Sequence, residues 1–216
     1  MERLMQEPET VLQPEYAALI RQQDERPDQK VRFKDTIYSE DWASVLWQEP
    51  AKEARRFFEE RLTGKPLVDL GGGIGWMTGF ANELRVGKYI NVDRNHHKDL
   101  PSDPHKIINS GPLGINIQAD MLDFVARLKD GVANFAINGV NQEAINDERY
   151  VEALAKEVMR ATQNGGLIFG IRSGVLAKIS RTLDNENSAF REVDLGKETG
   201  FRVKTRSSQY IFERTA

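Results

Sequence analysis

Glycines and one acid gather at a single point of this 216-residue sequence, in the segment KPLVDLGGGIGWMTGF at residues 65–80. A short apolar run leads into Asp69, and four glycines follow that acid: Gly71, Gly72, Gly73 and Gly75. Glycine permits tight turns and lets a ligand lie directly against the backbone. We therefore expect a flat or extended ligand to bind at this loop.

Further polar side chains follow other short apolar runs. INVDR ends in Asp93 and Arg94, IQADMLDF contains Asp120 and Met121, and FAINGV contains Asn138. Carboxylates accept hydrogen bonds from hydroxyl and amine groups. Asp120 also precedes MLDFVARLKD, where its side chain is suited to cap a helix, and asparagine before glycine is also an ordinary turn.

The elements that position these residues alternate along the chain. Short apolar runs at 66–70, 88–93, 114–120, 132–139 and 165–172 predict strands, and amphipathic segments at 76–85, 121–129, 147–163 and 174–184 predict the helices between them. The tail at 200–215 alternates and predicts two strands in a hairpin-like pair. This alternation of strands and helices indicates a parallel sheet that ends in antiparallel strands. The carboxyl ends of the parallel strands meet at one edge of such a sheet.

Asp69 and the glycines form the pattern D-x-G-x-G-x-G at the end of a strand. Together with the acids that end the next two strands, this pattern resembles the class I S-adenosylmethionine-dependent methyltransferases over residues 63–216. The resemblance implies an α/β three-layer sandwich with a mostly parallel seven-stranded sheet, its last strand antiparallel, in a Rossmann-like methyltransferase fold. Residues 1–62 are expected to add N-terminal helices that cap the substrate site or pack against it.

The resemblance also implies an enzyme with S-adenosylmethionine as its cofactor and gives each residue a role. Asp69 would orient the glycine loop or the cofactor amino group, Asp93 would hold the ribose hydroxyls, and Asp120 would accept from the adenine amine. A carboxylate has the lone pairs for both tasks. The remaining cofactor-binding residues implied by the resemblance are Met121 over the adenine ring, Arg94, Asn138 and the four glycines. No catalytic residue is indicated.

Other readings of the loop are less consistent with the sequence. A nicotinamide-binding loop requires glycine at position 76, where the sequence has Trp76, and the G-x-x-x-x-G-K-[ST] pattern of phosphate-binding loops is absent. An aminopropyl transferase would need an acidic polyamine site after the fourth strand. A non-catalytic binding or regulatory protein that keeps the methyltransferase fold stays open as the alternative function.

Charge and composition bear on the partners. The net charge of −3 and the pI of about 5.8 give no broad basic surface, so we expect a small-molecule acceptor and no nucleic acid. The chain has no cysteine, and the segment MERLMQEPETVLQPEY is charged and lacks the apolar core of a signal peptide. No apolar run reaches membrane-spanning length, so we expect a cytoplasmic protein without a membrane partner. The oligomeric state is not indicated.

Two sets of side chains, three aromatic residues and three histidines, are expected to have no direct role at the binding site. Tyr38, Trp42 and Trp47 precede the first strand at helical spacing, which is typical of packing. The segment 94–114 contains all three histidines of the chain, and its spacing matches no metal-ligand pattern. We therefore expect this segment to be a surface loop and the protein to hold no metal.

Overall fold

The computed structural model describes residues 12–24, 52–73, 75, 77–94, 114–137, 147–171, 174–183, 189–199 and 209–215. Asn138, Trp76, the three histidines and the three aromatic residues at 38, 42 and 47 lie outside these ranges. The structural statements below concern the described residues.

The described strands form one seven-stranded sheet with the order β3-β2-β1-β4-β5-β7-β6. Strands β1 to β5 pair in parallel, and β7 runs antiparallel to both β5 and β6. This topology confirms the predicted fold class. The strand bounds are β1 Pro66–Leu70, β2 Lys88–Asp93, β3 Gly114–Gln118, β4 Asn134–Ile137, β5 Leu167–Ile171, β6 Phe190–Glu192 and β7 Gln209–Arg214.

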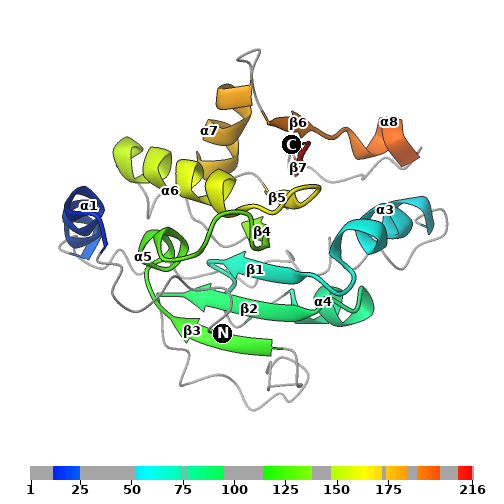
Figure 1. Ribbon diagram of the computed structural model, residues 1–216, viewed down its shortest axis with the longest axis horizontal. Helices are drawn as coiled ribbons and strands as arrows, with labels where there is room; N and C mark the ends of the chain where they lie inside the picture. Colours follow the sequence, from blue (N-terminus) through cyan, green and yellow to red (C-terminus); the bar gives the residue numbers. More distant parts are fainter. Residues whose placement is uncertain are drawn as a thin grey trace.

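Helices cover both faces of this sheet. Figure 1 shows α1, α5 and α6 together at one side of the strands and α3 with α4 at the other. Their bounds are α1 Pro14–Asp24, α3 Lys52–Leu62, α4 Thr78–Glu83, α5 Met121–Ala126, α6 Glu148–Ala161, α7 Gly174–Leu183 and α8 Leu195–Thr199. The longest of these helices, α6, has 14 residues, and no helix in the described ranges could cross a bilayer.

Each buried strand contributes side chains to two apolar cores, because successive side chains point to opposite faces of the sheet. Val68 and Ile90 lie in the core shared with α1, α5, α6 and α7. Leu67 and Tyr89 lie in the core shared with α3, α4 and α8. Strands buried on both faces read as continuous apolar runs, which is why the sequence identified them.

Helix α3 contributes large side chains to the second core. Phe58 is fully buried, and its ring lies 5.4 Å from that of Phe80 on α4 and 5.5 Å from that of Phe169 on β5. Phe57 and Leu62 are buried in the same core. This helix belongs to the predicted segment 1–62, whose division from residues 63–216 stays a prediction.

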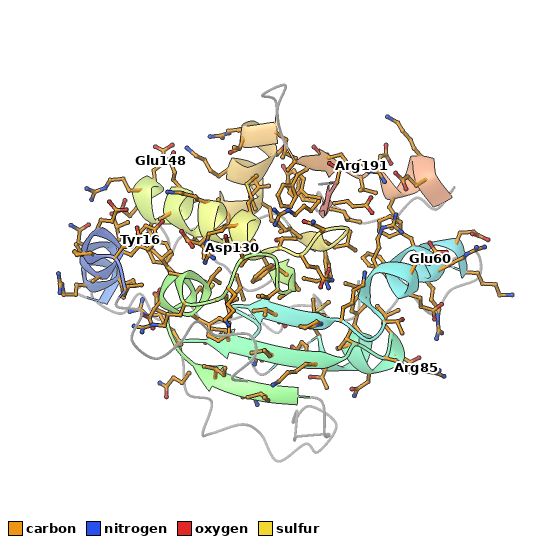
Figure 2. All side chains as sticks on the ribbon, viewed as in Figure 1. Tyr16, Glu60, Arg85, Asp130, Glu148 and Arg191 are labelled. Carbon is orange, nitrogen blue, oxygen red and sulfur yellow. The ribbon has the colours of Figure 1, made fainter. Side chains whose placement is uncertain are left out.

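Helix α1 packs against α5 and α6, and a buried hydrogen bond joins it to α6. The Tyr16 hydroxyl donates to Glu157 Oε1 at 2.8 Å, and Arg160 Nε donates to Glu157 Oε2 at 2.6 Å. Figure 2 shows Tyr16 on α1, beside the helices α5 and α6. Burial and Glu157 raise the pKa of Tyr16, so its hydroxyl stays protonated and acts as a donor.

The closing part of the sheet contains one strand that was not predicted. Two strands were expected within residues 200–215: the second is present as β7, and the residues of the first, before 209, lie outside the described ranges. The neighbour of β7 at the sheet edge is β6 at Phe190–Glu192, which precedes the predicted pair, and Val193 N donates to Ile211 O at 2.7 Å just beyond it. A strand of three residues is too short to show an alternating pattern, so sequence periodicity could not locate β6.

Candidate cofactor-binding site

The glycine loop begins where β1 ends and stays attached to β2. Gly71 N donates to Val92 O at 2.8 Å, which carries the pairing one residue past the strand. Gly71, Gly73 and Gly75 have φ angles of 68°, 56° and 80°, in the left-handed region that favours glycine. The loop therefore turns sharply at the carboxyl edge of the sheet, where parallel α/β proteins bind ligands.

Asp69 lies beneath this loop and is fully buried. The Tyr89 hydroxyl on β2 donates to Asp69 Oδ2 at 2.7 Å. A Cβ atom at Gly72 would lie 2.3 Å from both Asp69 Oδ2 and Asn91 Oδ1, so the backbone passes directly over these side chains. Burial, followed by the neighbouring Asp69, raises the pKa of Tyr89 well above its usual value, which keeps the hydroxyl a donor.

Two side chains of β2 contact the Gly73 peptide. Asp93 Oδ2 accepts from Gly73 N at 2.9 Å, and Asn91 Nδ2 donates to Gly73 O at 2.8 Å. Asn91 Nδ2 also lies 3.1 Å from Asn116 Oδ1 on β3. The register places Asp69, Asn91 and Asn116 side by side on three neighbouring strands.

The sequence-based reasoning did not identify Asn91. The sequence feature that could have identified it is the segment YINVD. In a strand, residues 89, 91 and 93 of this segment lie on the same face of the sheet. An asparagine at such a position is unusual because a buried amide must find hydrogen-bond partners. The sequence does not indicate which partners those are.

Asp120 caps helix α5, as its position in the sequence suggested. Its Oδ1 accepts from Leu122 N at 2.8 Å and from Asp123 N at 3.2 Å. The Tyr150 hydroxyl on α6 lies 2.9 Å from Oδ1 and 3.0 Å from Oδ2. Burial raises the pKa of Asp120, and the hydrogen bonds from Tyr150 and the two amides oppose that rise.

The remaining predicted residues lie at the same edge or outside the described ranges. Arg94 is exposed at the end of β2, and its positive charge acts to lower the pKa of Asp120. Met121 is the first residue of α5 and packs in part against the first core. Ala119 N donates to Asp93 O at 3.0 Å, which keeps the β2 and β3 ends together. Asn138 is not described.

These residues fit the predicted cofactor in chemistry and position. A loop of backbone amides lies beside the Asp93 carboxylate, and a second carboxylate, Asp120, follows the adjacent strand. A carboxylate that accepts one backbone amide retains lone pairs for a ribose hydroxyl. The individual cofactor roles stay predictions. Within the described ranges no group of three or more His, Asp or Glu side chains could hold a metal ion, and the three histidines lie outside them.

Several solved structures have a similar fold. A proposed methyltransferase from Escherichia coli is 9% identical, with a TM-score of 0.51, covering 84% of this chain and 89% of its own. An rRNA methylase from Streptococcus thermophilus is 11% identical, with a TM-score of 0.50, covering 79% and 99%. A proposed S-adenosylmethionine-dependent methyltransferase from Listeria monocytogenes is 13% identical, with a TM-score of 0.50, covering 77% and 100%. No family model and no curated protein matches the sequence.

The chain therefore has the class I methyltransferase fold that the sequence predicted. At these low identities the likeness establishes the fold.

The expected partner was wrong. The sequence analysis favoured a small-molecule acceptor and argued against nucleic acid, yet one solved structure with this fold is an rRNA methylase. The prediction was based on the net charge of −3, which is a sum over the whole chain. Nucleic-acid binding depends on the local field at one face, which that sum does not report.

Proposed function

We propose that this protein is an S-adenosylmethionine-dependent methyltransferase. The observation that carries the proposal is the Gly73 peptide of a D-x-G-x-G-x-G loop held by Asp93, the acid that ends the adjacent strand. This arrangement lies at the carboxyl edge of a sheet with class I methyltransferase topology. A phosphate-free cofactor needs no lysine in this loop, and the loop has none.

In this proposal two carboxylates contact the cofactor and a third supports the loop. Asp93 accepts from the ribose, Asp120 accepts from the adenine amine, and Asp69 stays beneath the loop and orients it. Met121 and Arg94 flank the adenine and ribose positions, and Asn138 follows the fourth strand. The bound cofactor supplies an electrophilic methyl group on a sulfonium. The protein aligns the acceptor with that group and excludes water, so no general base is required for every acceptor.

We further propose that the acceptor is an RNA. Support comes from the Streptococcus thermophilus structure, which has the same fold and is named an rRNA methylase. A large acceptor is also compatible with a site at the exposed edge of the sheet, where Arg94 lies in solvent. The cytoplasmic location expected from the sequence belongs to the same proposal and stays a prediction.

Calorimetric titration with S-adenosylmethionine and S-adenosylhomocysteine, with NAD as the control, tests the cofactor. We expect saturable binding of both sulfur compounds and none of NAD. Asp93→Ala should weaken that binding about tenfold or more because it removes a charged acceptor. If the parent protein is folded and binds neither compound, the proposal fails.

Transfer of a radiolabelled methyl group to total RNA, compared with total protein from the same cells, tests the acceptor. Label in the RNA fraction that is lost on ribonuclease treatment supports an RNA acceptor. Label in protein, or cofactor binding without any transfer, contradicts it and favours respectively a protein acceptor or a non-catalytic binding protein.

A further inference from the structure

The Gly73 peptide is held at both of its polar groups by one strand. Asp93 Oδ2 accepts from its N–H at 2.9 Å, and Asn91 Nδ2 donates to its C=O at 2.8 Å. Asn91 and Asp93 are two residues apart on β2, so their side chains point to the same face of the sheet. Gly73 has a φ of 56°. Glycine adopts positive and negative φ angles about equally readily, so the residue type alone does not fix this conformation.

The environment of Asn91 shows that this contact is built into the fold. The side chain is 3% exposed, and it lies between Asp69 on β1 and Asn116 on β3 in the register. Its Oδ1 accepts no hydrogen bond from the described part of the chain, and the Gly72 backbone passes directly above it. Burying an amide with an incompletely satisfied acceptor costs free energy, so packing alone does not account for an asparagine at this position.

We infer that Asn91 is a positioning residue that preforms the glycine loop for its ligand. This inference rests on the proposed function. Fixing the backbone of one residue in a single conformation costs conformational entropy. When Asn91 and Asp93 hold Gly73 in the free protein, ligand binding no longer bears that cost, and affinity rises accordingly. Asn91 itself touches the loop and not the reacting atoms.

A purely structural role for Asn91 makes a different prediction. In that case its hydrogen bond to Asn116 would join β2 to β3, and the loop would be unaffected. Asn116→Ala removes this bond and leaves the Gly73 contact in place. It therefore separates the two roles.

Asn134 supplies a matched control for buried amides. It is fully buried on β4, donates to Pro66 O at 3.1 Å and accepts from Leu167 N at 2.8 Å. These contacts bridge the amino-terminal ends of β1 and β5, at the opposite edge of the sheet from the glycine loop. Asn134→Leu should therefore lower stability without acting on the loop.

The experiment measures S-adenosylhomocysteine affinity and hydrogen exchange of residues 71–75 in four full-length proteins: the parent, N91L, N116A and N134L. We expect N91L to raise Kd about tenfold and to speed exchange at the loop, since about 1.4 kcal/mol corresponds to a factor of ten. N116A and N134L should keep Kd within about twofold of the parent, although N134L unfolds at a lower temperature. If N91L does not fold, Asn91→Ser replaces it in the experiment. The serine hydroxyl is too short to reach Gly73, so this variant also removes the contact.

The outcomes separate the two proposals. Parental affinity and parental loop exchange in N91L overturn the inference, as does an equal loss of affinity in N134L or N116A. If the parent binds no S-adenosylhomocysteine, the proposed function fails. Exchange then decides the role of Asn91: faster exchange confined to residues 71–75 in N91L still supports it, and unchanged exchange overturns it.

Discussion

Gly72 lies where two buried side chains leave no room for a methyl group. A Cβ atom there would lie 2.3 Å from Asp69 Oδ2 and from Asn91 Oδ1. We expect Gly72→Ala to cost about 1–3 kcal/mol of unfolding free energy, as overpacking commonly does, and to raise the Kd for the cofactor about tenfold or more. Urea denaturation and calorimetric titration measure the two effects.

Gly79 is the matched glycine in which the same change should help. It lies in helix α4, and a Cβ atom there would have no atom within 4 Å. Glycine inside a helix is less favourable than alanine by about 0.5–1 kcal/mol, so Gly79→Ala should stabilise the protein by that amount. A Gly72→Ala variant that is stabilised as much as Gly79→Ala would show that the contact at Gly72 is not tight.

The Tyr150 hydroxyl is expected to stabilise the Asp120 cap of helix α5. Tyr150→Phe keeps the buried ring and removes the hydroxyl that contacts both oxygens of Asp120. Hydrogen bonds to charged groups contribute about 1.5–3 kcal/mol, and the two amides remain bound to the carboxylate, so a loss near the lower end, about 1.5 kcal/mol, is expected. The pKa of Asp120 should rise further, because Tyr150 acts to lower it. NMR titration of the carboxyl carbon would detect this, and an unmoved pKa would contradict it.

The sequence supplied residue types at the site but not their contacts. Asp69, the glycines, Asp93 and Asp120 could be identified because strand-end acids and glycines have local signatures. The partners Asn91, Tyr89 and Tyr150 come from other strands and helices. Their contacts depend on the register of parallel strands and on where α6 packs, which local sequence patterns do not contain.

At the scale of elements, helix α3 is joined to the end of the sheet by one carboxylate. Glu213 on β7 accepts from Arg61 Nε at 2.8 Å and lies 2.5 Å from Arg191 on β6. Arg191 also lies 2.6 Å from Glu198 on α8, and Figure 2 labels it where β6 and α8 meet. Glu213 therefore connects helix α3 with the two strands at the edge of the sheet, β6 and β7.

This connection gives a pH dependence. Burial acts to raise the pKa of Glu213, but hydrogen bonds from Arg61 and Arg191 outweigh it and hold the pKa below its usual value. A pKa that is lower in the folded state stabilises the protein above the unfolded-state pKa, and this stabilisation is lost as the pH falls through the folded-state pKa. Glu213→Gln should cost about 1–2 kcal/mol at neutral pH, where Arg191 is partly screened by solvent, and progressively less below about pH 4.5.

Urea denaturation of parent and Glu213→Gln at several pH values measures this difference. A constant difference from neutral to acidic pH would show that the variant loses packing and not charge.

Element boundaries followed the sequence most closely where an element is buried on both sides. β1 and β2 coincide with PLVDL and KYINVD, the runs identified from the sequence. β4 and β5 each begin two residues later than predicted, and Gly165 before β5 lies in a turn with a φ of 65°. The predicted ends of both strands, residues 138–139 and 172, lie outside the described residues. The exception is β6, whose three residues pair with β7 through tertiary packing that no local pattern indicates.

At the scale of the whole molecule, helix α3 packs into the second core although it precedes the predicted boundary at residue 63. Ala54, Phe57, Phe58 and Leu62 are buried against residues of β1, α4 and β5. We expect the fragment 63–216 to expose those apolar surfaces and to aggregate. Size-exclusion chromatography and thermal denaturation of the fragment test this. A monomeric fragment with a cooperative transition would instead establish residue 63 as a true domain boundary.

The order of the strands also bears on how the chain is made. β7 lies between β5 and β6, although it follows both of them in the sequence. The ribosome emits the chain from its amino terminus, so β5 and β6 emerge before the strand that joins them. Until residues 209–214 leave the exit tunnel, the nascent chain presents an open edge of β5. Such an edge pairs readily with strands of other chains. We therefore expect the nascent chain to be most prone to aggregation, and chaperone binding to matter most, during this interval of translation.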